Sequence, residues 1–227
     1  SKHLYCQRRE KVELDKDLQA RQQARELARQ AEQAQKTLAQ MPQEKLNAIV
    51  QAVADAFAKA APELAELAVR ETGFGNAEDK IIKNRFASMQ LAEALRGMKT
   101  VGILREIPEK KLWEIGVPVG VIAAIVPSTN PTSTICYKAL IAIKSGNAIV
   151  FSPHPKAADC TLRAARILAA AAEKAGAPAG CIGCLSMASM AALIILSVGS
   201  VSTYDLLSSL RAELCISVHC PSLKLFD

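Results

Sequence analysis

Two polar segments that contain proline each follow a short apolar run, and their side chains could hydrogen-bond a ligand. The first segment follows residues 121–126 and consists of Pro127, Ser128, Thr129 and Asn130. The second follows residues 148–151 and consists of Ser152, Pro153, His154 and Pro155. In folds built from parallel strands, ligands bind in the loops that follow the carboxyl ends of the strands. The residues alone therefore predict a ligand-binding edge but do not identify the ligand.

A strand, a helix and a second strand would bring these two segments together. Residues 121–126 are apolar and rich in β-branched side chains, and a proline ends the run. Pro131 suits the first position of a helix, and Asn130 suits the N-cap before it. Apolar residues then recur at helical spacing up to Gly146, and the apolar run 148–151 follows at once. This order predicts a βαβ unit with two parallel strands.

The composition favours Ala-rich helices packed on a sheet. Half of the 227 residues are hydrophobic, but only 4% are aromatic, so aliphatic side chains must supply the core. The formal charge of +6 would attract anions such as nucleotides or nucleic acid. However, no basic run is interleaved with aromatic residues, and no known nucleic-acid-binding signature is present. We therefore expect no nucleic-acid partner.

The hydropathy pattern predicts neither a secretory signal nor a membrane partner. Residues 1–11 lack the apolar segment of a signal peptide. The run 175–204 is long and uncharged, but Gly, Ser, Cys and Pro dilute it below the usual pattern of a transmembrane helix.

The seven cysteines indicate a reduced, intracellular chain. Their number is odd and their spacing scattered, which does not suggest a disulfide framework; they are Cys6, Cys136, Cys160, Cys181, Cys184, Cys215 and Cys220. Cys181 and Cys184 have the C-x-x-C spacing of redox and zinc motifs, but no second pair at metal-ligand spacing accompanies them. We favour structural thiols and expect no metal site.

The first half of the chain predicts helices. Leu and Ala residues over 14–38 recur every three or four positions, which predicts an amphipathic helix docked on the domain or on a neighbouring subunit, rather than a detachable targeting helix. Residues 43–70 predict two consecutive helices, interrupted at Ala61 and Pro62. A further helix is capped by Asn76 and runs to about Gly97. Its charged side chains are expected to be solvated: Lys80, Lys83 and Arg85.

The remaining pattern completes an α/β fold. Residues 103–107 and 112–115 predict a hairpin, residues 156–175 a helix, and residues 182–187 another strand. The fold class predicted is a Rossmann-like parallel sheet with flanking helices and an N-terminal helical arm. We divide the chain into a lead and amphipathic helix (1–41), a cofactor-binding domain (42–187) and a divergent tail (188–227).

Three motifs in this order resemble the CoA-acylating aldehyde dehydrogenases. The first is the turn 71–75, with the sequence ETGFG, together with the charged residues that follow it at 78–80 and 83–84. The second is the run 120–131, and the third is the SPHP turn at 152–155. The resemblance covers roughly residues 24–186. Similar sequences include acetaldehyde and propionaldehyde dehydrogenases of bacterial microcompartments and the N-terminal half of the bifunctional alcohol dehydrogenase.

This resemblance implies a chemistry and a set of site residues. In the family, a cysteine thiolate attacks a small aldehyde, hydride passes to NAD, and CoA releases the acyl group as acyl-CoA. By position, Asn130 matches the asparagine whose amide donates to the developing oxyanion; the alternative is a helix cap. The cofactor cleft would include Pro127, Ser128, Thr129, Ser152, His154 and Pro155. For His154, a contact with a phosphate of NAD or CoA and a purely local turn role stay open.

One departure bears on activity. In the family, the nucleophilic cysteine lies in a second domain downstream of the SPHP turn, and none of the seven cysteines lies in such a segment. The resemblance therefore implies a truncated, cytoplasmic NAD- and CoA-binding portion that is inactive alone, or a specialised short form. A bacterial microcompartment is the other location implied. Expected partners are a small aldehyde, CoA, and either further copies of the chain or a full-length homologue. The alternative is a non-catalytic assembly or regulatory subunit that joins such partners through the helix at 14–38.

Overall fold

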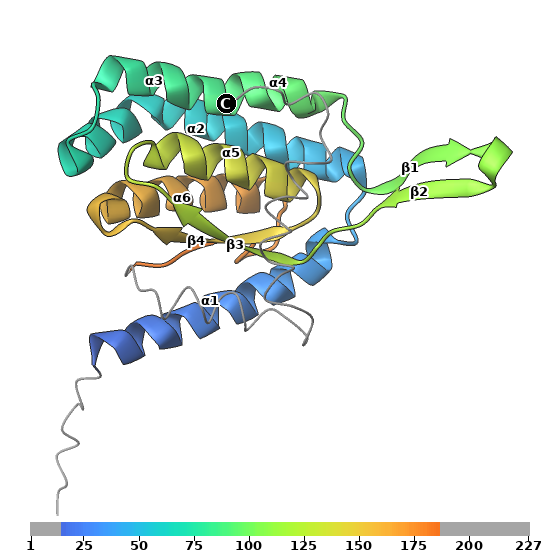
Figure 1. Ribbon diagram of the computed structural model, residues 1–227, viewed down its shortest axis with the longest axis horizontal. Helices are drawn as coiled ribbons and strands as arrows, with labels where there is room; N and C mark the ends of the chain where they lie inside the picture. Colours follow the sequence, from blue (N-terminus) through green and yellow to red (C-terminus); the bar gives the residue numbers. More distant parts are fainter. Residues whose placement is uncertain (1–14, 187–227) are drawn as a thin grey trace, which may run out of the picture.

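The computed structural model describes residues 15–186, in which a small parallel sheet carries helices on both faces (Figure 1). The predictions made for the N-terminal lead and for the tail at 188–227 lie outside the described residues, as do Cys6, Cys215 and Cys220. Within the described part, no helix is long and apolar enough to cross a membrane.

The sheet is the predicted βαβ unit extended by one strand. Its strands are β3 (Val121–Val126), β4 (Ala148–Pro153) and β5 (Ile182–Cys184), and they pair in parallel in that order. Each residue of β4 is buried, as expected for a central strand covered on both faces. The predicted α/β fold class is therefore confirmed.

Helices α5 (Pro131–Lys144) and α6 (Ala158–Lys174) pack on one face of the sheet, and the short 3₁₀ turn η3 (Pro155–Ala157) precedes α6. Helix α1 (Lys16–Leu38) lies along the other face. Its buried stripe consists of Ala20, Ala24, Ala28, Ala31, Ala34 and Leu38. Alanine side chains let a helix approach a sheet closely, and this stripe packs against the sheet of the same chain. Docking on the domain is confirmed, and most of the stripe is not free to join another subunit.

Helix α2 (Gln43–Thr72) is continuous, so the predicted interruption at Ala61 and Pro62 is wrong. A proline inside a helix costs about 3 kcal/mol because one backbone hydrogen bond is lost. Here the proline ring faces solvent, and the carbonyl that it leaves without a donor can be hydrated. Apolar residues on both sides of it, such as Phe57 and Leu64, are fully buried. Burial of this stripe against α5 and α6 outweighs the cost.

The outermost layer runs from α3 (Ala77–Arg85) through the π turn η1 (Phe86–Gln90) into α4 (Leu91–Arg96). The predicted cap is confirmed, because the Asp79 amide donates to Asn76 Oδ1 at 2.8 Å. The predicted hairpin is also confirmed: β1 (Gly102–Ile107) and β2 (Leu112–Gly116) are antiparallel, joined by the turn η2 (Pro108–Lys110), and extend away from the sheet (Figure 1).

Candidate functional site

The two predicted loops leave the same edge of the sheet from neighbouring strands. Val126, at the end of β3, pairs with Pro153, at the end of β4. One residue further on, the His154 amide donates to the Val126 carbonyl at 3.1 Å. The parallel register therefore brings the segments 127–130 and 153–155 together at the carboxyl edge, as the sequence predicted.

Asn130 occupies the N-cap position of α5, but its side chain does not cap the helix. Its carbonyl accepts the first helical hydrogen bond, from the Thr134 amide at 3.2 Å. The side-chain oxygen Oδ1 instead faces Lys83 Nζ at 3.5 Å, the long limit of a hydrogen bond. An ammonium group can only donate, so it orients the amide with Nδ2 turned toward other acceptors. The helix-cap interpretation of the Asn130 side chain is thus wrong in its hydrogen bonding, and within residues 15–186 no acceptor is found for Nδ2.

Lys80 anchors the loop that carries Asn130. Its Nζ donates to the Thr129 carbonyl at 2.8 Å, and the residue is only 5% exposed. Burial, followed by repulsion from Lys83, lowers the pKa of Lys80. The prediction that Lys80 is solvated is therefore wrong, whereas Lys83 and Arg85 are exposed as predicted.

A buried polar contact joins α3 to the start of α5. Asn84 accepts from Thr132 Oγ1 at 2.9 Å and donates to the Ala61 carbonyl of α2 at 3.3 Å. The inward face of α3 is thus polar, while Ile82 on the outward face is 67% exposed. Sequence reasoning missed this contact because an apolar residue is normally assigned to the buried face of a helix. The available signal was the spacing of four between the two polar residues at 80 and 84.

Glu71 ties the ETGFG turn to the other loop of the site. Its Oε1 accepts from the Asp159 amide at 2.9 Å, and its Oε2 accepts from the Cys160 amide at 2.8 Å. Both amides belong to the first turn of α6, which follows the SPHP segment after the short turn η3. A carboxylate at this position satisfies helix donors that have no partner within the helix and interacts favourably with the helix dipole. The Glu71 carboxylate therefore already accepts the hydrogen bonds that the N-terminus of α6 could offer to a ligand.

The six residues predicted to bind cofactor differ in accessibility. Ser152 is buried inside β4, at 4% exposure, so little of it is open to a ligand. The other five are exposed or half-buried there: Pro127, Ser128, Thr129, His154 and Pro155. His154 Nδ1 accepts from the Lys156 amide at 3.1 Å. Because Nδ1 accepts this bond, Nε2 is the ring nitrogen that can donate to a ligand.

Residues 7–197 of the chain match the aldehyde dehydrogenase family. The chain belongs to this family. It is 47% identical, over 152 residues, to the bifunctional aldehyde-alcohol dehydrogenase AdhE of Escherichia coli K12, with 67% of this chain and 17% of that protein covered. An acetylating aldehyde dehydrogenase from Geobacillus thermoglucosidasius has 52% sequence identity and a TM-score of 0.79, with 81% of this chain and 40% of that chain covered.

A more distant structure shows a ligand of the acylating branch. The propionaldehyde dehydrogenase of Rhodopseudomonas palustris, 26% identical with a TM-score of 0.64, holds CoA and an acylated cysteine; 77% of this chain and 39% of that one are covered. The predicted resemblance to CoA-acylating aldehyde dehydrogenases is confirmed. This chain spans about a sixth of the bifunctional relative and about two fifths of the two solved structures.

In this aldehyde dehydrogenase chain, each cysteine that the structure describes is a buried, free thiol: Cys136, Cys160, Cys181 and Cys184. Burial raises the pKa of Cys181 and Cys184 to about 12. Burial, with the neighbouring Glu71 carboxylate, does the same for Cys160, and burial raises the pKa of Cys136 well above its usual value. Because the thiolate is the nucleophile, none of these four is suited to attack an aldehyde at neutral pH.

Proposed function

We propose that the described region is the NAD- and CoA-binding portion of a CoA-acylating aldehyde dehydrogenase. The cofactors would lie across the paired loops at the carboxyl edge of β3 and β4. The observation that carries the proposal is the orientation of Asn130, whose carbonyl oxygen faces Lys83 while Nδ2 stays free to donate. Such a neutral donor beside a reacting carbonyl stabilises the negative charge that develops on its oxygen.

Other chain residues would support this task rather than perform chemistry. Lys80 holds the Thr129 carbonyl and so fixes the loop that precedes Asn130. Exposed Lys83 and Lys156 give the edge a positive charge that suits the phosphates of NAD and CoA. His154 would contribute its Nε2 proton to a phosphate or ribose oxygen. A small aldehyde as substrate, a cytoplasmic location and assembly into homo-oligomers belong to the same proposal.

A negative charge placed in the first loop should weaken the binding of both ligands. Replacing exposed Thr129 with glutamate leaves the backbone carbonyl, and hence the contact with Lys80, in place. We expect the dissociation constants of NADH and CoA to rise about tenfold through repulsion of their phosphates. The measurement is calorimetric titration of each ligand into the 227-residue chain.

The matched control is Val117→Glu, an exposed position that precedes β3 at the opposite edge of the sheet. This variant carries the same added charge and should bind both ligands like the unsubstituted chain. Equal weakening in the two variants, or no binding by the unsubstituted chain, would contradict the proposed site.

The chain by itself should not catalyse the oxidation of an aldehyde. None of the four described cysteines is an accessible thiolate, so formation of the thiohemiacetal lacks a nucleophile among the described residues. We expect no NADH absorbance to develop at 340 nm when the purified chain is mixed with acetaldehyde, NAD and CoA, although the cofactors bind. Sustained NADH formation that depends on CoA would refute the inactivity while leaving the binding proposal intact.

A further inference from the structure

The β1–β2 hairpin is an arm that projects from the helical body and makes most of its contacts within itself (Figure 1). Glycines with positive φ stand in both of its legs, Gly102 at 74° and Gly120 at 121°. Because glycine adopts many backbone conformations, the two legs do not by themselves fix the direction of the arm. Several large apolar side chains on the arm are exposed: Ile103, Leu104, Leu112, Trp113 and Ile115.

Gln43, the first residue of α2, holds the chain where it enters the arm. Its Oε1 accepts from the Thr100 amide at 2.7 Å and from the Val101 amide at 3.1 Å. The Thr100 hydroxyl donates to the same oxygen at 3.1 Å. These donors lie directly before Gly102, so one side-chain oxygen ties the root of the arm to α2.

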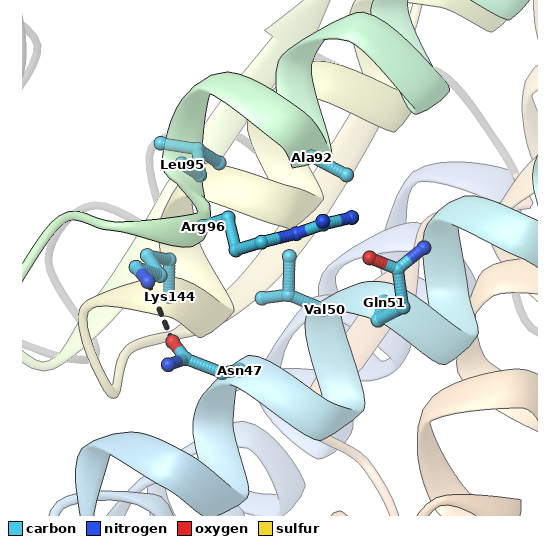
Figure 2. Close-up of a pocket in the computed structure, with 7 residues that line it drawn as sticks. All are labelled: Asn47, Val50, Gln51, Ala92, Leu95, Arg96 and Lys144. Atoms are coloured by element: carbon cyan, nitrogen blue, oxygen red, sulfur yellow. Dashed lines mark hydrogen bonds between the residues drawn. The ribbon is translucent and has the colours of Figure 1, made fainter.

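The other side of the Gln43 amide is fixed by two acceptors. Its Nε2 donates to Asn47 Oδ1 at 3.2 Å and to the Lys144 carbonyl at 3.3 Å. The Asn47 oxygen is held in turn by the Lys144 ammonium, which donates to it at 2.5 Å (Figure 2). An ammonium group can only donate and a backbone carbonyl can only accept. The set therefore has one consistent orientation, in which Gln43 Oε1 faces the arm.

Lys144 joins the root of the arm to α5. The residue is 2% exposed and lies in the last turn of this helix. Its carbonyl also accepts from the Thr100 hydroxyl at 2.5 Å. A helix of 14 residues places its two ends about 20 Å apart, so Lys144 acts at the arm and not at the loop that carries Asn130.

We propose that the Gln43 side chain is a latch that fixes the direction of the arm, and that Asn47 and Lys144 are the positioning residues that orient it. The latched arm moves with α2 and α5 as one rigid body, so its exposed apolar side chains are presented in one direction. Without the latch, the arm turns about its two glycine-containing legs.

Trp113 makes the latch observable, because it is the single tryptophan of the chain and is 59% exposed on the arm. Gln43→Ala removes the latch and leaves a good helix former. The amplitude of the nanosecond decay in the time-resolved fluorescence anisotropy of Trp113 should then rise about twofold. Hydrogen exchange of the Thr100 and Val101 amides, followed by NMR, should become about ten- to a hundredfold faster, since both amides lose their acceptor.

A second variant separates hydrogen bonding from packing. Gln43→Met keeps the length of the side chain but loses the amide, so it should change both readings as Gln43→Ala does. The matched control is Gln51→Met, which removes the same group from the same helix, where the Gln51 amide donates to Asp55 at 2.9 Å. This control should behave like the unsubstituted chain. Unchanged readings in Gln43→Met, or an equal change in Gln51→Met, would overturn the proposal.

Discussion

Replacing Glu71 with glutamine is expected to lower the free energy of unfolding by about 2–3 kcal/mol. The carboxylate accepts two backbone donors from the first turn of α6, at 2.9 and 2.8 Å. Glutamine keeps one acceptor but turns its NH₂ group toward the second donor, and it loses the charge that complements the helix dipole. Urea unfolding followed by circular dichroism at pH 7 measures the difference.

The chain offers a matched control for this variant. Glu63 also lies on α2 and also reaches α6, where it pairs with Arg163 at 2.8 Å. Both partners of this pair are about half exposed, so Glu63→Gln should cost no more than about 0.5 kcal/mol. A loss for Glu71→Gln as small as that for Glu63→Gln would mean that water can replace the carboxylate at the end of α6.

The elements that carry the site follow from short-range sequence patterns. Parallel strands with loops at one edge can be predicted from the apolar runs at 121–126 and 148–151 and from the prolines that follow them. The predicted hairpin and the Asn76 cap rest on equally local signals, and both occur. Local patterns succeed here because strand and cap preferences depend on residues within a few positions of one another.

The contacts that hold the loops in place depend on tertiary structure and were not predictable in the same way. Lys80 is buried only because the Thr129 carbonyl, 49 positions away, provides an acceptor inside the fold. Glu71 meets α6 across 88 positions. Pro62 stays within a helix because its neighbours are buried by α5 and α6. In each case, burial or a distant partner overrides the preference of the residue itself.

Raising the pH from 8 to 10 should destabilise the described fold through its buried thiols. The pKa of Cys160, Cys181 and Cys184 is about 12 in the folded chain, against a usual value of 9.0. The folded state therefore retains protons that the unfolded state releases above pH 9. Their stabilising contribution is complete below pH 9 and is lost as the pH rises from 9 toward 12. Lys80 and Lys144 act in the opposite direction, because a lowered lysine pKa makes stability rise with pH up to 10.5.

Each thiol loses about 1.4 kcal/mol for each pH unit above 9. The four buried thiols, Cys136 included, therefore cost roughly 5–6 kcal/mol together at pH 10 before the lysines offset part of it. The double variant Cys181→Ala and Cys184→Ala removes two of these four thiols, and both lie on or beside β5. It should therefore lose about 3 kcal/mol less than the unsubstituted chain between pH 8 and pH 10, whatever its stability at pH 8. Urea unfolding at both pH values, with a reducing agent present, gives the two differences. The contrary result is that both proteins lose the same free energy of unfolding between pH 8 and pH 10. Solvent would then reach these thiols in the folded state, and they could not be called unreactive.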